Sequence, residues 1–99
     1  MKVSLPGAFL QDLQEGLESY DDPAADIILE KIATTPAVRA GRGYRVIIDV
    51  DDYEAEIIVR EAEYRAEYWG TSAYGVYQKD HARANAAKRV AASLKASVG

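Results

Sequence analysis

The 99-residue chain contains no cysteine and only one histidine, one tryptophan and one phenylalanine. Without cysteine there are no disulfides, no thiolate chemistry and no cysteine-based zinc site. No apolar run is long enough to span a membrane, and the first residues reach Gln11 and Asp12 too early for a signal peptide. The length fits a single domain, 1–99. We therefore expect a cytoplasmic protein without a membrane segment or a cofactor.

The net charge of -4 is distributed in alternating blocks along the chain. Residues 1–36 and 51–70 each carry a net charge of -5, whereas residues 37–50 carry +2 and residues 71–99 carry +4. The favoured interpretation is internal: the basic C-terminal helix lies near acidic helices. The alternative is a basic surface for an anionic partner.

Two helices are predicted in the N-terminal third. Phe9 and Leu13 belong to an apolar series at helical spacing that predicts a helix over 6–19. Asp22 is placed to cap a second helix, Pro23 suits its first position, and the next proline ends it. The short break between them indicates a helical hairpin.

The segment 44–50 predicts a strand, because it is rich in β-branched residues and places Val46, Ile48 and Val50 on one face. It follows a basic, glycine-containing segment that predicts a flexible loop. A single strand cannot satisfy its own backbone groups. The candidate partners are "KVSLP", "PAVRA" or the same strand of a second copy. We expect an α+β fold of about four helices with a small sheet, in which this strand has one short partner.

The longest helix is predicted to follow this strand. Asp51 and Glu54 have the spacing of a capping box, and Gly70 stands where a C-terminal cap is expected. After a loop, an alanine-rich helix is predicted from Lys79 to about Val98. The predicted fold is therefore dominated by helices.

The helix after Asp51 has two apolar stripes when plotted at ~100° per residue. The inner stripe contains Ala55, Ile58, Val59, Ala62, Ala66 and Trp69. The tyrosine stripe contains Tyr53, Ile57, Tyr64 and Tyr68. Glu54, Glu61 and Arg65 separate the two stripes. One core needs only one stripe, so the second one calls for an explanation.

The tyrosine stripe predicts an interaction surface, because tyrosine buries a large area and keeps a hydroxyl for a polar partner. Trp69, Tyr74 and Tyr77 are expected nearby. The specific expectation is a homodimer, with a different protein as another possible partner. The alternative is that another element of the same chain covers the stripe.

Catalysis is the least favoured class of function. The only histidine, His81, stands beside Asp80, which makes neither a metal site nor a triad. The acid pair Asp51 and Asp52 is better explained by helix capping.

The second hypothesis is a nucleic-acid-binding regulator that uses a basic loop, 39–45, and the basic C-terminal helix, 79–95. Its candidate residues are Arg39, Arg42, Arg45, Arg83, Lys88, Arg89 and Lys95. No known nucleic-acid-binding motif supports it.

The segments "VIIDVDDYEAEIIVREAEYRAEYW" and "HARANAAKRVAASLKA" resemble small uncharacterised accessory proteins of actinobacterial phages. The resemblance extends from Tyr44 to Leu94 and transfers no functional residue. It implies a viral protein with an accessory role in the host cytoplasm, such as binding or inhibiting a host protein.

Overall fold

The computed structural model describes residues 1–71 and 78–98 of the chain. In chain order the elements are β1 (Lys2–Pro6), α1 (Gly7–Glu18), α2 (Pro23–Thr34), β2 (Val38–Ala40), β3 (Gly43–Asp49), α3 (Asp52–Thr71) and α4 (Gln78–Val98). The predicted α+β fold with four helices, an N-terminal helical hairpin and a small sheet is confirmed.

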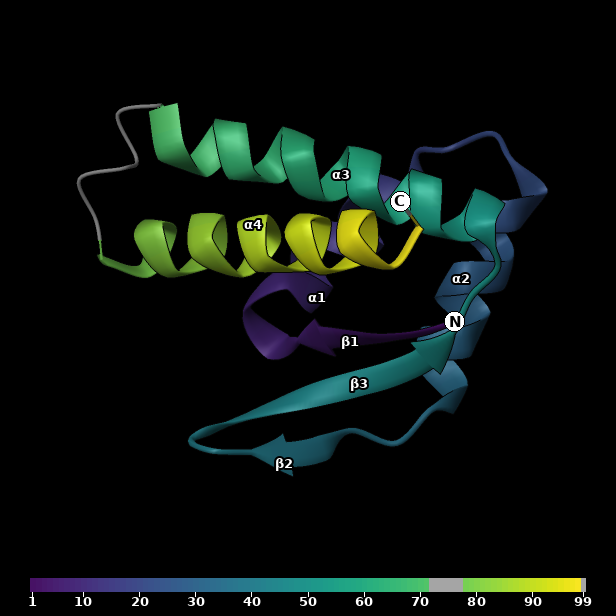
Figure 1. Cartoon of the computed structure of the whole chain (residues 1–99), viewed down its shortest axis with the longest axis horizontal. Coiled ribbons are helices and arrows are strands. Elements are labelled where there is room, and N and C mark those ends of the chain that lie inside the picture. The colour runs from purple at the N-terminus through teal and green to yellow at the C-terminus, as the bar shows by residue number, and fades with distance from the viewer. Residues whose placement is uncertain (72–77, 99) are drawn as a thin grey trace.

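The two long helices and the sheet lie on different sides of the molecule. Figure 1 shows α3 and α4 running side by side, with the three strands beyond them and the N-terminus beside the end of β3. The helix α4 also contacts β1, while α1 contacts β1, β3, α3 and α4. The helix α1 therefore lies in the centre of the fold, between the sheet and the two long helices.

The sheet has the order β1-β3-β2, and both pairings are antiparallel. Both candidate segments therefore pair with the predicted strand, one on each side, where a single partner was expected. Val3 lies opposite Ile48, and Leu5 lies opposite Val46. All four side chains are buried, because α1 and α2 cover this face of the sheet. The residues between them form the outer face of the sheet, which is exposed.

The glycine-containing segment before β3 is ordered as a hairpin, so the expectation of a flexible loop is wrong. Val38–Ala40 forms β2, and Ala40 pairs with Gly43 across a two-residue turn. Gly41 has a φ of 61°, which glycine adopts readily and which the first turn position of such a hairpin favours. The paired strands explain how the backbone of this short segment is satisfied.

The predicted starts of α2 and α3 are confirmed by hydrogen bonds, whereas α1 begins at Gly7, after Pro6 of β1, and has no side-chain cap. The Asp22 side chain accepts a hydrogen bond from the backbone N–H of Ala24 at 2.9 Å. At the start of α3, Asp51 Oδ1 accepts from the N–H of Glu54 at 2.7 Å, and Glu54 Oε1 accepts from the N–H of Asp51 at 2.9 Å. The predicted C-terminal cap at Gly70 is wrong, because α3 continues through this glycine to Thr71.

The core is formed where α1 meets the sheet and the other helices. The largest fully buried side chains are Leu5, Phe9, Leu13, Leu17, Ile28, Ile57, Ile58 and Leu94. Within the described ranges, no helix has both the length and the apolar character that a membrane crossing requires.

Candidate functional site

The helix α3 is buried over a much wider arc than its inner stripe. Ala55, Ile58 and Ala62 are fully buried, so the inner stripe faces the core as predicted. Ile57, which was assigned to the tyrosine stripe, is only 2% exposed. Its assignment to the partner surface is wrong, because α1 and α2 contact α3 on one flank while α4 contacts it on the other.

Of the three polar residues between the two stripes, two are buried and the third is partly buried. Glu54 and Glu61 are 4% and 9% exposed, and the Arg65 side chain is 17% exposed. The helical pattern predicts only that these residues separate the two stripes, and it does not predict that they are shielded from solvent. Each of them meets a specific neighbour from the N-terminal hairpin.

Arg65 and Trp69 share one buried carboxylate from α1. Asp12, which is 2% exposed, accepts a hydrogen bond through Oδ2 from Trp69 Nε1 at 3.0 Å. Its Oδ1 lies 3.7 Å from Arg65 Nη1. Glu15 adds a second, looser ion pair to Arg65 at 4.0 Å. Asp12 therefore fixes the second half of α3 against α1.

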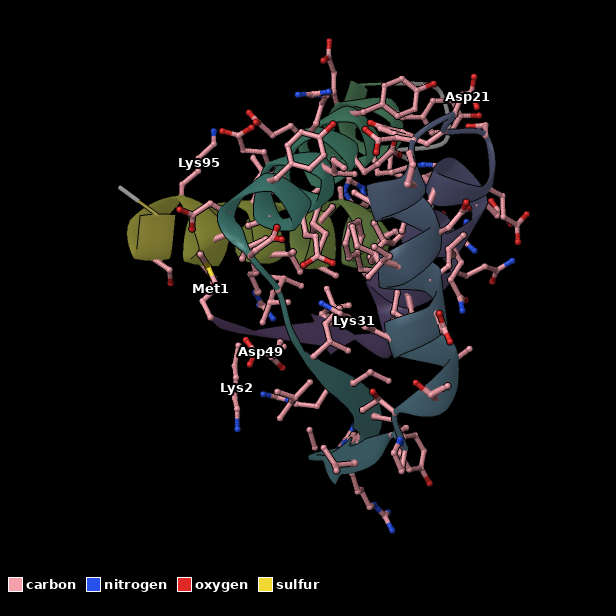
Figure 2. The ribbon with its side chains drawn as sticks, turned by 90° about the vertical axis from the view of Figure 1, so that its right-hand side faces the viewer. Met1, Lys2, Asp21, Lys31, Asp49 and Lys95 are labelled. Carbon is pink, nitrogen blue, oxygen red and sulfur yellow. The ribbon has the colours of Figure 1, made fainter. Side chains whose placement is uncertain are left out.

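Glu54 forms the corresponding contact near the start of α3. Lys31 Nζ lies 3.0 Å from Glu54 Oε2 and donates a second hydrogen bond to the backbone oxygen of Asp49 at 2.7 Å. Figure 2 shows Lys31 extending from α2 toward the end of β3, where Asp49 lies. One lysine thus ties α2, β3 and α3 together.

Glu61 lies against a glycine of α1. A Cβ atom on Gly16 would stand 2.1 Å from Glu61 Oε2, so only glycine leaves room for the carboxylate in this position. Tyr20 lies close to the same carboxylate. Burial, together with the Glu61 charge, raises the pKa of the Tyr20 hydroxyl.

Three tyrosines of α3 remain exposed beside this buried polar row. The exposed fractions are 54% for Tyr53, 60% for Tyr64 and 40% for Tyr68. We call these three residues the tyrosine face. Tyr64 and Tyr68 are stacked, with ring centroids 6.3 Å apart, and Tyr68 meets Trp69 edge to face at 4.9 Å. The second half of the face is therefore a continuous aromatic cluster.

Tyr53 is held at the other end of the tyrosine face by a contact within the chain. Its hydroxyl donates a hydrogen bond to Oδ2 of Asp22, the residue that caps α2. This bond lowers the pKa of Asp22 and raises the pKa of Tyr53. The ring of Tyr53 nevertheless stays exposed.

Trp69 anchors the aromatic cluster to the rest of the fold. It is half-buried, binds Asp12 through its ring nitrogen and lies under the Arg83 guanidinium at 4.6 Å. Such a cation–π contact joins α4 to α3. Tyr74 and Tyr77, which were expected to extend the aromatic surface, lie outside the described residues.

Two of the basic residues of the second hypothesis are already engaged within the chain. Arg83 is engaged with Trp69, and Lys95 forms a 2.9 Å ion pair with Glu63. Arg39 and Arg42 are exposed on the hairpin. The remaining candidates are exposed as well: Arg45, Lys88 and Arg89. The Lys95–Glu63 pair supports the internal explanation of the charge blocks at this point of the molecule.

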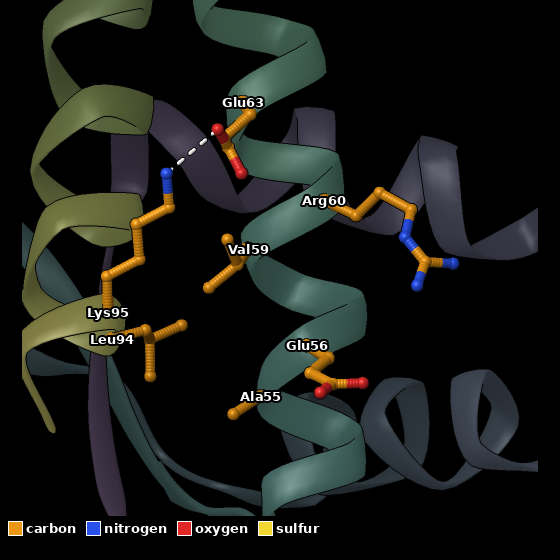
Figure 3. A pocket seen from close by; sticks show the side chains of 7 residues that line it. All are labelled: Ala55, Glu56, Val59, Arg60, Glu63, Leu94 and Lys95. Atoms are coloured by element: carbon orange, nitrogen blue, oxygen red, sulfur yellow. Dashed lines mark hydrogen bonds and ion pairs between the residues drawn. The ribbon is translucent and has the colours of Figure 1, made fainter. Parts of the chain in front are cut away.

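A groove of about 490 Å³ runs between α3 and the end of α4. Figure 3 shows Val59 and Leu94 pointing into it and the Lys95–Glu63 pair bridging the two helices. The groove contains no histidine. In the described part of the chain, no three acidic or histidine side chains are grouped so that they could hold a metal ion. His81 is exposed on α4.

Comparison with known proteins adds no family. No protein-family model, no curated protein and no solved structure shows a significant match to the chain.

Proposed function

We propose that this chain is a small, non-catalytic interaction protein that binds its partner through the tyrosine face of α3. The supporting observation is the exposure of Tyr53, Tyr64 and Tyr68 on a helix whose other side is already fixed by burial. Among the described residues, the core is formed without the rings of Tyr53 and Tyr64. These two exposed rings therefore offer contact area to a second molecule.

The chemistry of the face suits a protein partner. Tyrosine rings supply large contact areas at a low entropic cost, and their hydroxyls can meet polar groups at the edge of an interface. The stacked pair Tyr64 and Tyr68 is backed by Trp69, which is itself hydrogen-bonded to Asp12. A preorganised aromatic surface loses little side-chain freedom when it binds.

A second copy of the chain is the partner that we favour. Next to the tyrosines, α3 exposes Glu56 and Arg60, which carry opposite charges. A two-fold axis across α3 brings each charge toward its opposite in the other copy, which makes the surface self-complementary. A different protein, including a host protein as the phage resemblance implies, is the alternative occupant of the same face.

Light scattering of wild-type protein and of Tyr64→Ser/Tyr68→Ser tests the proposal. We expect the wild type to dimerise with increasing concentration and the variant to dimerise at least about tenfold more weakly, as a loss of some 1.4 kcal/mol implies. The matched control is Tyr44→Ser, which removes an exposed tyrosine from β3 and should leave the dimer intact. A wild-type chain that stays monomeric at ~1 mM excludes a useful homodimer, and unfolding of the double variant would assign the two rings to the core.

A further inference from the structure

A second groove lies on another part of the molecule, where the outer face of the sheet meets α4. It has a volume of about 560 Å³ and shares no residue with the tyrosine face. Arg45 reaches it from β3, where its register partner is Pro6 of β1, and Arg89 reaches it from α4. Two arginines that are far apart in sequence therefore line one groove.

The polar groups of this groove are suited to an anion. Asn85 lies one helical turn before Arg89, and two serines also line the groove, Ser4 from β1 and Ser93 from α4. Over the described residues, neither Arg45 nor Arg89 forms an ion pair, and none of the described lining residues is acidic. Positive charge is thus left uncompensated here on a chain whose net charge is -4.

We propose that this groove binds a small organic phosphate. The phosphate group lies between Arg45 and Arg89, whose planar guanidinium groups match phosphate oxygens in pairs. The uncharged part of the ligand packs on Val90 and on the alanines and proline that complete the lining. The start of α1 also borders the groove, and it has neither a side-chain cap nor an acidic residue in its first turn. Its positive helix end adds to the field of the two arginines.

The dimensions favour a small molecule over a nucleic acid. The volume of the groove lies within the range of small-ligand sites, which is about 300–1,000 Å³. A polymer would need a row of free basic residues along its backbone. Two of the other basic residues of α4 are already engaged within the chain, because Arg83 lies over Trp69 and Lys95 is paired with Glu63.

The test titrates adenosine diphosphate and, separately, adenosine into the wild-type chain at low and moderate salt. Binding of each probe is measured from changes in the amide chemical shifts. Because the two probes share their organic part, a difference between them reports on the phosphates. We expect the diphosphate to shift amides around Ser4, Arg45 and Arg89, and adenosine to bind at least about tenfold more weakly. Equal binding of the two probes, or shifts confined to other surfaces, would overturn the proposal.

Substitutions then test whether Arg45 and Arg89 are the residues that bind the diphosphate. Arg45→Gln and Arg89→Gln should each weaken diphosphate binding roughly tenfold or more, while the amide spectrum keeps the dispersion of the folded chain. The matched control is Lys88→Gln, which removes a charge from the neighbouring position of α4 outside this groove. Unchanged affinity in both arginine variants would contradict the proposal. A short oligothymidine that binds more tightly than the diphosphate, and that depends on Arg39 and Arg42, would overturn it in favour of nucleic acid.

Discussion

Two neighbouring flanks of α3 differ in burial: the polar flank, which faces the N-terminal hairpin, and the aromatic flank, which carries the tyrosines. On one flank the charged residues Glu54 and Glu61 are buried, whereas on the next the aromatic rings of Tyr53 and Tyr64 are exposed. From hydropathy alone, the charged side chains would be expected at the surface and the aromatic rings in the core. The reason is that α1 and α2 cover the polar flank and stop short of the aromatic one.

Two of the charges on the polar flank have an oppositely charged partner on the hairpin: Lys31 neutralises Glu54, and Asp12 faces Arg65. Glu61 lies in the space that Gly16 leaves, beside the Tyr20 hydroxyl. A buried charge without such a partner would cost several kcal/mol. Burial on α3 is therefore decided by what lies opposite each residue, and Tyr53 and Tyr64 are exposed because the helices α1 and α2 do not extend over them.

The largest expected effect compares two members of the predicted tyrosine stripe. Ile57→Ala should lower the free energy of unfolding by about 2–5 kcal/mol, because it opens a cavity at a side chain that is 2% exposed. Tyr64→Ala should change it by less than about 0.5 kcal/mol, because that ring is 60% exposed. Urea denaturation of dilute, monomeric protein measures both values.

This pair of substitutions separates core from surface on one helix. Equal losses in the two variants would show that Tyr64 is part of the core and would remove the basis of the proposed interface. Equal tolerance would show that the hairpin does not cover Ile57 in solution.

A smaller effect is expected from the buried carboxylate. Asp12→Ala removes the acceptor of the Trp69 indole and the nearest charge to Arg65. The free energy of unfolding should fall by about 2–3 kcal/mol, because a donor and a cation are left partly buried without this partner. Thermal or urea unfolding, followed by Trp69 fluorescence, measures the loss.

Asp12→Asn is the matched control for this experiment. The amide oxygen can still accept from Trp69, so the loss should be smaller than in Asp12→Ala and should come from the ion pair. If Asp12→Ala is as stable as the wild type, the contact between α1 and α3 does not depend on this carboxylate, and the contrast between the two flanks has another cause.

Most of the fold could be predicted because its boundaries are encoded locally. Asp22 and Asp51 predict helix starts because they can act as N-caps, and the alternation of apolar residues around Ile48 predicts a strand. The end of α3 could not be predicted from Gly70, since a glycine within a helix is tolerated when the neighbouring packing is favourable. The number of strand partners was also open, because both flanking segments are short and neither carries a pairing signal.

The candidate site could be predicted only in part. The tyrosines were identified by their spacing, and their exposure agrees with a surface role. Ile57 was placed with them because it shares their side of the helix, yet helical angle says nothing about where a neighbouring helix ends. The partners of Glu54, Glu61 and Arg65 come from α1 and α2, far away in the sequence. The Asp12 carboxylate that faces Arg65, for example, also binds Trp69, which is 57 positions away. A local pattern could not reveal such contacts.

The smallest effect is expected at the boundary between the two flanks, where Tyr53 belongs partly to each. Tyr53→Phe removes the hydroxyl that donates to Asp22 and keeps the exposed ring. Because this bond is the main cause of the lowered pKa of Asp22, the pKa of that carboxyl should rise toward its ordinary value in the variant. Carboxyl chemical shifts across an acid titration measure it.

The sign of the pH dependence follows from the direction of this shift. A carboxyl whose pKa is lowered in the folded state adds stability above its ordinary pKa and loses that contribution as the pH falls through the folded value. The wild type should therefore be slightly more stable than Tyr53→Phe at neutral pH, and the difference should disappear in acid. An unchanged Asp22 titration would mean that the hydroxyl of Tyr53 is not engaged with α2 in solution and is available, like the ring, to a partner.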